Sequence, residues 1–162
     1  MEQEHIVPAE SLIPHRGGMK LLERVINPGS SGLQAETTVA QSWPLSRDGS
    51  VSSLLCVELV AQAISALSTW RRGEGARPRP GLLVGIKEAQ FFTERLPVGA
   101  GLSIRVDELY HVGSYAVFKG EVACGSALCC SATIQVMEPE EDDFLNQLKK
   151  RGSHSAGEGT ED

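Results

Sequence analysis

Residues 54–72 have the sequence LLCVELVAQAISALSTWRR, which predicts a long helix with apolar side chains on almost every side. A helix that is hydrophobic all round is a buried one, so the rest of the chain must fold around it. Ser52 and Ser53, directly before this stretch, are residue types that cap helix N-termini. Gly73 and Pro78 belong to the cluster of glycines and prolines that ends it. We therefore expect one central helix over residues 54–72.

Six strands are predicted in the remaining sequence, because apolar and polar residues alternate there between clusters of turn-forming residues. Two precede the helix and four follow it, at residues 19–26, 32–40, 82–92, 101–111, 115–124 and 126–137. We expect residues 1–18 to be an irregular lead-in, residues 41–53 a loop, and the four later strands a succession of hairpins. One long helix with an antiparallel sheet wrapped around it is an α+β arrangement, the hotdog fold.

The length of 162 residues fits one domain, which we place at residues 1–137, followed by a largely disordered acidic tail at residues 138–162. This tail holds eight of the 21 acidic residues but only three of the 15 basic ones, so it carries most of the net charge of −6. The body of the chain therefore lacks the basic surface that binding to nucleic acid requires.

The sequence also argues against membranes, export and metals. No apolar run approaches the roughly 20 residues of a membrane span, and residues 1–5 lack the features of a secretion signal. We expect a cytoplasmic protein without a cofactor. The four cysteines have neither a CxxC pair nor a nearby histidine, so they predict small buried thiols and no metal site. They are Cys56, Cys124, Cys129 and Cys130.

Glu58 and Gln62 interrupt the apolar part of the predicted helix, and their spacing of four residues places them on one face. A carboxylate that is buried without a partner is costly, and one that is kept in such a place suits acid–base chemistry. A structural alternative stays open, in which Glu58 faces solvent or a subunit contact and Gln62 is its hydrogen-bond partner.

Four short segments carry a family resemblance, which covers roughly residues 10–138. Residues 12–25 are LIPHRGGMKLLERV, residues 56–63 are CVELVAQA, residues 85–91 are GIKEAQF and residues 96–99 are LPVG. They resemble, in order, the PHR segment, the E-x-x-A-Q helix, the third-strand motif and the following turn of 3-hydroxyacyl-[acyl-carrier-protein] dehydratases of the FabA/FabZ type. The chain is most similar to the divergent subgroup associated with aryl-polyene pathways.

The resemblance implies an acyl chain bound in a tunnel at a dimer interface, with a histidine and a carboxylate as the catalytic pair. Glu58 matches the carboxylate that helps the 3-hydroxyl leave as water. The family's base is a histidine in the loop before the helix, where this chain has Trp43, and an indole nitrogen cannot accept a proton. The catalytic histidine is therefore interpreted as replaced by Trp43, and Trp43→His is expected to raise activity. His15 of the PHR segment, mainly structural in the family, is the remaining candidate base.

The start of the helix is a candidate substrate site, because free amides there can polarise a thioester carbonyl. Ser53 stands where the family has a glycine, although a role as a simple cap is equally open. We expect Ser53 and Leu54 to contact the substrate, together with Gln62 and Trp43.

Four arginines after the helix are a candidate docking site for an acidic acyl carrier protein, because a basic cluster at a tunnel mouth would steer it. An ordinary solvated loop is the alternative. The four are Arg71, Arg72, Arg77 and Arg79. The sequence thus predicts dehydration of a 3-hydroxyacyl thioester on carrier protein or coenzyme A, by a homodimer or higher oligomer. A hotdog thioesterase and an inactive thioester-binding or structural subunit remain alternatives.

Overall fold

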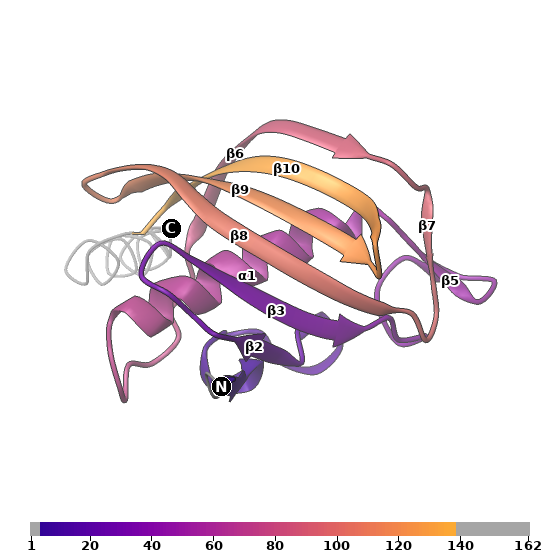
Figure 1. Ribbon diagram of the computed structural model, residues 1–162, viewed down its shortest axis with the longest axis horizontal. Coiled ribbons are helices and arrows are strands. Elements are labelled where there is room, and N and C mark those ends of the chain that lie inside the picture. The colour runs from indigo at the N-terminus through magenta and orange to yellow at the C-terminus, as the bar shows by residue number, and fades with distance from the viewer. Residues whose placement is uncertain (1–3, 139–162) are drawn as a thin grey trace, which may run out of the picture.

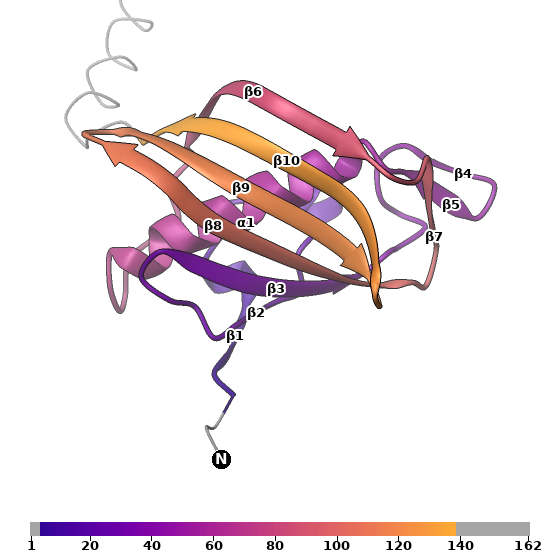
Figure 2. The ribbon, with the colours of Figure 1, turned by 45° about the horizontal axis from the view of Figure 1, so that its top comes forward.

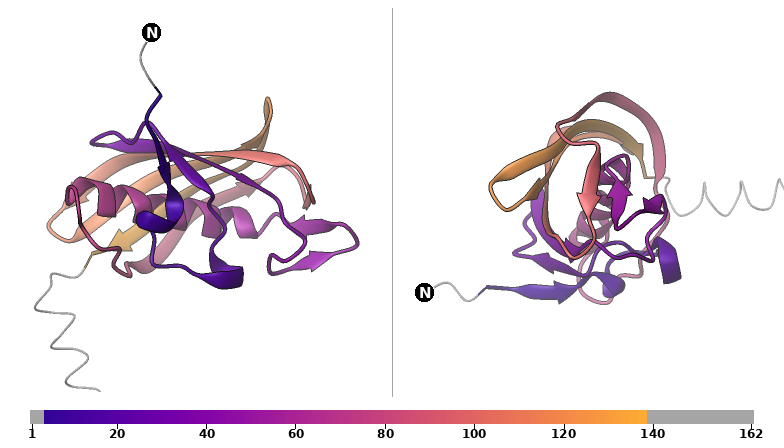
Figure 3. Two further views of the ribbon diagram at one scale, coloured as in Figure 1. Left: turned by 90° about the horizontal axis from the view of Figure 1, so that it is seen from below. Right: turned by 90° about the vertical axis from the view of Figure 1, so that its right-hand side faces the viewer.

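The computed structural model describes residues 4–138, which form a curved antiparallel main sheet packed on one long helix (Figure 1). The helix, α1, spans Leu55–Arg71, and the main sheet has the strand order β1-β2-β3-β8-β9-β10-β6. Its strands are Ile6–Pro8 (β1), Arg24–Ile26 (β2), Gly32–Thr38 (β3), Leu82–Phe91 (β6), Gly101–Val112 (β8), Tyr115–Cys124 (β9) and Ala127–Met137 (β10). Figure 3 shows these strands curving over α1, which confirms the predicted hotdog arrangement.

A second, three-stranded sheet lies at one end of the molecule (Figure 2). It consists of Ser46–Arg47 (β4), Ser50–Ser52 (β5) and Arg95–Pro97 (β7). The Arg95 side chain holds this sheet together, because it donates hydrogen bonds to the Ser50 hydroxyl at 2.5 Å and to the Arg47 carbonyl oxygen at 3.2 Å. The expectation of a plain loop at residues 41–53 is therefore wrong, since strands of two and three residues give no readable alternation.

The strand order also corrects the expected succession of four hairpins. β8, β9 and β10 do follow one another as hairpins, but β6 pairs with β10 and forms an edge of the main sheet. β7 intervenes between β6 and β8, and β8 pairs with β3. The chain therefore crosses the end of the molecule between β6 and β8 and does not turn directly back.

The N-terminal segment is more ordered than the expected irregular lead-in. β1 pairs with β2, and two short 3-10 helices occupy Ala9–Ser11 and Gly17–Met19. The strand predicted at residues 19–26 is correspondingly shortened to β2. The physical reason is that the amides of Leu21 and Leu22 donate to a side chain of α1, as described below, and to no neighbouring strand.

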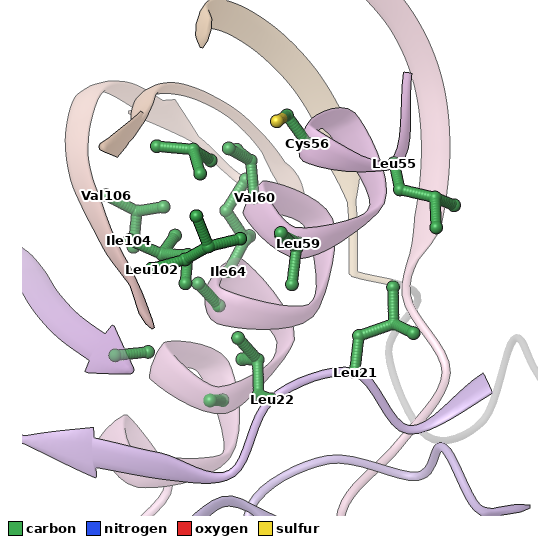
Figure 4. Packing of buried hydrophobic residues seen from close by; sticks show 14 of the residues in the cluster. Leu21, Leu22, Leu55, Cys56, Leu59, Val60, Ile64, Leu102, Ile104 and Val106 are labelled. Carbon is green, nitrogen blue, oxygen red and sulfur yellow. The ribbon is translucent and has the colours of Figure 1, made fainter. Parts of the chain in front are cut away.

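The core lies between α1 and the concave face of the sheet. Alternate residues of β8 are buried against α1, among them Leu102, Ile104 and Val106, and Figure 4 shows them beside Val60 and Ile64. Burial of each such side chain contributes about 1.5–3 kcal/mol. β9 comes so close to α1 that a Cβ atom on Gly120 would overlap the side chain of Val60.

The N-terminus of α1 differs from the expectation of a serine cap. Leu54 occupies the cap position without a side-chain cap bond, and the Ser52 hydroxyl accepts the Leu54 amide at 3.3 Å. At the other end, Gly73 follows with a φ of 97°, a conformation that glycine adopts readily and that ends helices. Within residues 4–138 no helix has the length and apolar character that crossing a membrane requires.

Candidate active site

A cavity of about 250 Å³ runs along one face of α1. The α1 side chains at its wall recur every three or four residues, the spacing of one helical face. They include Glu58, Ala61, Ser65 and Ser68, and Arg72, the residue directly after α1, continues this face. Pro14 and His15 cover one end, and residues 79–83, which lead into β6, cover the other. The helical spacing from Glu58 would have identified Ser65 and Ser68 in the sequence. Pro14, His15 and residues 79–83 could not be identified in this way, because they reach α1 only in the folded chain.

Gln62 fixes the position of Glu58 and does not line the cavity as a substrate contact. Its side chain is 0% exposed, and its amide nitrogen donates to Glu58 Oε1 at 2.9 Å and to the Met19 carbonyl oxygen at 2.7 Å. Its amide oxygen accepts the amides of Leu21 at 3.0 Å and Leu22 at 3.4 Å. One buried side chain therefore ties the segment after the PHR motif to α1 and orients the carboxylate.

His15 lies beside Glu58 in the same chain. Its Nε2 atom is 3.4 Å from Glu58 Oε1, and the two side chains are 29% and 32% exposed, so both are accessible from the cavity. Arg16 shapes this segment, because its guanidinium donates to the carbonyl oxygens of Ile13 and His15, both at 2.7 Å. Among the described residues, none accepts from or donates to the buried Nδ1 atom of His15.

This arrangement supplies a proton acceptor and a carboxyl group at one point of a largely apolar cavity. An imidazole and a carboxyl group this close can act as an acid–base pair on adjacent atoms of one substrate. Ile64, Leu83 and Val136 contribute to the apolar wall that would hold such a substrate away from water.

Trp43 does not face this cavity. Its side chain is 6% exposed and belongs to the hydrophobic core. Its backbone amide donates to the Ala40 carbonyl oxygen at 3.1 Å. The position expected to carry the missing base and to contact the substrate therefore lies in the hydrophobic core. A tryptophan buries a large apolar side chain there, and a histidine would bury less apolar surface.

The start of α1 lies outside the cavity that holds Glu58. The Ser53 side chain is buried, and its amide already donates to the Glu94 carbonyl oxygen at 3.0 Å, so it is no free donor for a thioester carbonyl. Leu54 is 61% exposed and lines a second, open cavity of about 370 Å³ together with Phe91 and Phe92.

The predicted arginine cluster divides into two parts. Arg71 pairs with Glu108 at 2.5 Å and donates to the Ser30 carbonyl oxygen at 2.6 Å, so it fastens the end of α1 to its surroundings. Arg72 and Arg79 line the cavity, at the end away from Glu58. Arg77 lies next to them, because its carbonyl oxygen accepts from Arg72 Nη1 at 2.8 Å.

The cysteines are free thiols, and three of the four are buried. A hydrogen bond with Cys130 and burial raise the pKa of the Cys56 thiol well above its ordinary value, so Cys56 stays protonated and unreactive at neutral pH. Within the part of the chain that the structure describes, no group of three or more histidine, cysteine or acidic side chains is placed to hold a metal ion.

Comparisons with solved structures show what this chain is similar to. The dehydratase heterocomplex ApeI:P from Xenorhabdus doucetiae contains a chain that is 25% identical, with a TM-score of 0.76, over 88% of this chain and 97% of that one. A hypothetical thioesterase with coenzyme A from Streptococcus pneumoniae is 16% identical, with a TM-score of 0.55, over 70% and 82% of the two chains. The uncharacterized protein PH1136 from Pyrococcus horikoshii is 16% identical, with a TM-score of 0.61, over 83% and 96%.

The latter two similarities show the hotdog fold alone. A comparison with curated protein sequences found no match. A family model, described as ApeP-like: ApeP dehydratase, matches residues 7–149, which includes the PHR segment, α1 and the complete main sheet apart from Ile6. The chain therefore belongs to the ApeP-like family of dehydratases, hotdog-fold relatives of the FabA/FabZ enzymes.

Proposed function

We propose that this chain removes water from a 3-hydroxyacyl thioester, with His15 and Glu58 as the acid–base pair. The observation that carries the proposal is the distance of 3.4 Å between His15 Nε2 and Glu58 Oε1 at the wall of one cavity. Dehydration requires one group that takes the α-proton and one that protonates the leaving 3-hydroxyl. The two functional groups of the pair are adjacent, as are the two substrate carbons they act on.

The proposed reaction uses the His15 imidazole as the proton acceptor and the Glu58 carboxyl group as the proton donor. His15 Nε2 takes the proton from the α-carbon, the Cα–Cβ double bond forms, and the Cβ–O bond breaks. Glu58 gives its proton to the departing hydroxyl, which leaves as water. His15 then carries the proton taken from the α-carbon, Glu58 lacks the proton that left with the water, and transfer from His15 to Glu58 across their contact restores the starting state. Gln62 keeps the carboxyl in place throughout, through its bond to Glu58 Oε1.

We further propose that a second copy of this chain pairs with the free edge of β6. This strand is ten residues long and forms an end of the main sheet, and long exposed edges are sites of strand addition. Its large apolar side chains are about half exposed. They include Leu82 at 51%, Leu83 at 50%, Val84 at 49% and Ile86 at 48%. Leu82 and Leu83 also line the cavity, so the pairing would complete its wall.

Light scattering on the purified protein tests this assembly. We expect a mass of twice the 17.4 kDa of the chain, and a shift to the monomer when Ile86→Lys places a charge on the edge. The matched control is Lys119→Glu, an exposed charge change on β9 within the sheet, which should leave the mass unchanged. A monomeric protein that pairs only with another hotdog chain would contradict self-association and would indicate a heterocomplex like that of ApeI:P.

The carrier of the thioester is proposed from the basic end of the cavity. Arg72, Arg77 and Arg79 lie together there, and an acidic carrier protein or the phosphates of coenzyme A complement them. We keep the cytoplasmic location as part of the proposal, because all four cysteines are free thiols, as a reducing compartment maintains them.

Product analysis with a 3-hydroxyacyl pantetheine thioester tests the reaction. We expect the 2-enoyl thioester, seen by its ultraviolet absorbance, without release of free thiol. Release of thiol from saturated and hydroxylated substrates alike would support the thioesterase alternative. Neither product, from a protein with the expected assembly, would support a subunit that binds without catalysis.

A further inference from the structure

We infer that Arg16 is a positioning residue for His15, because its side chain fixes the backbone that carries the imidazole. The inference rests on the proposed function, since it takes His15 as the group that accepts the α-proton. Each residue of the PHR segment then has a role. Pro14 leaves a carbonyl oxygen without a backbone donor, Arg16 supplies donors, and His15 is held between them.

A proline ends the short turn before the imidazole. The amides of Leu12 and Ile13 both donate to the Ala9 carbonyl oxygen, at 2.9 and 3.0 Å. The next amide in this series would donate to the Glu10 carbonyl oxygen, but it belongs to Pro14, which has no N–H group. The Glu10 carbonyl oxygen therefore takes its donor from outside the backbone of this turn.

Arg16 provides this donor and two further ones. Its Nη2 atom donates to the Glu10 carbonyl oxygen at 3.0 Å, and its Nη1 atom donates to those of Ile13 and His15, both at 2.7 Å. Its Nε atom lies 3.7 Å from Glu10 Oε1, so the carboxylate of the same residue holds the guanidinium in place. One planar side chain thus joins the histidine, the residue before the proline and the preceding turn.

Burial fixes the same segment from the other side. The side chains of Leu12 and Ile13 are buried and belong to the hydrophobic core, and Pro14 and His15 then line the cavity. Ile13 is therefore anchored twice, in the core through its side chain and at Arg16 through its carbonyl oxygen. The imidazole accordingly extends from a backbone that is held at both ends of a short segment.

The imidazole depends on this backbone for its direction. Its Nε2 atom faces Glu58, and its buried Nδ1 atom has no hydrogen-bond partner among the described residues. A catalytic imidazole is commonly oriented by a group that bonds its second nitrogen. Here the bonds from Arg16 to the backbone perform that task. A displacement of about 1 Å can lower a rate about 100-fold, so the position of the base matters as much as its presence.

Replacement of Arg16 should affect this position and not the fold. Its side chain is 54% exposed, and its bonds to the Glu10 and His15 carbonyl oxygens lie at the surface, where water can replace the lost donors. Water does not join the carbonyl oxygens to one another, so the segment becomes free to shift. Arg16→Lys keeps the positive charge but offers its donors from a single nitrogen atom, which separates the effect of the charge from that of the fork.

Proton NMR on the full-length protein tests the position of the imidazole without any reaction. We expect a nuclear Overhauser effect between the His15 ring protons beside Nε2 and the Glu58 methylene protons. Arg16→Gln and Arg16→Lys should each lose at least half of its intensity while the circular dichroism spectrum is unchanged. The matched control is Arg105→Gln on β8, which removes an exposed arginine paired with Asp107 and should keep the full intensity. Full intensity in Arg16→Gln, or in Arg16→Lys, would overturn the inference.

Kinetics with a 3-hydroxyacyl pantetheine thioester test whether Arg16 acts through His15. Arg16→Gln should lower kcat at least about tenfold and change KM less than about twofold, because the substrate still binds while the base is displaced. In a His15→Asn background the same substitution should lower the residual rate no further, since no base is left to position. An equal loss in both backgrounds would overturn the inference.

The two experiments also separate the role of Arg16 from the proposed reaction. A protein in which Arg16→Gln displaces the imidazole, but which forms no enoyl product, would refute the dehydratase and leave the positioning role intact. An active dehydratase in which Arg16→Gln leaves the imidazole in place would refute the positioning role and leave the reaction intact.

Discussion

Replacing Gln62 with leucine should destabilise the protein by about 3 kcal/mol or more. The side chain is completely buried and satisfies the Met19 carbonyl oxygen and the amides of Leu21 and Leu22. Leucine has a similar volume but no polar atom, so these three groups lose their partner inside the protein. Each buried group left unpaired costs about 1–3 kcal/mol, and the total is a large fraction of the 5–15 kcal/mol that typically holds a domain together.

Urea unfolding followed by circular dichroism measures this loss. Gln90→Leu is the matched control, because the Gln90 side chain is exposed and donates to Glu88 at 2.8 Å, and the unfolding free energy of this variant should change by less than about 0.5 kcal/mol. If Gln62→Leu unfolds within about 1 kcal/mol of the unmodified protein, the segment after the PHR motif does not depend on this side chain. The account of how Glu58 is positioned would then be refuted.

Three further predictions concern the core and the chain ends. Gly120→Ala should cost about 1–3 kcal/mol, because its methyl group overlaps Val60, and an unchanged unfolding midpoint would contradict the tight contact between β9 and α1. Trp43→His should lower the melting temperature without any gain in dehydratase rate, and a clear gain would show that position 43 reaches Glu58. Truncation after Glu138 should leave the cooperativity of unfolding unchanged, whereas its loss would place residues 139–162 within the folding unit.

The sequence predicted the long elements well, because each has a clear apolar period. The helix and the strands of ten or more residues agree with the structure to within one residue at each end. Short elements that depend on side-chain bonds from elsewhere were not predictable. β4 and β5 are held by Arg95, and the segment before β2 bonds Gln62, both from residues distant in sequence. The pairing of β6 with β10 likewise depends on tertiary packing.

The candidate site was predictable in part. The position of Glu58 on an apolar helix indicated acid–base chemistry, and it lines the cavity. Its contact with His15 joins residues 43 positions apart and leaves no periodic signal in the sequence. The family resemblance drew attention to Trp43, because a motif comparison aligns sequence positions and does not show where a side chain points. In the structure the side chain of Trp43 lies in the core.

The most direct test of the His15–Glu58 pair is deuterium exchange at the α-carbon of a saturated acyl pantetheine thioester in D₂O, followed by NMR. Such a substrate can lose its α-proton but has no hydroxyl to eliminate, so exchange isolates the base. We predict exchange by the unmodified protein and by Glu58→Gln, and a rate at least about 100-fold lower with His15→Asn. With the 3-hydroxyacyl thioester, Glu58→Gln should then fail to form the enoyl product. Undiminished exchange by His15→Asn would contradict the central claim, because the α-proton would have to leave to another base.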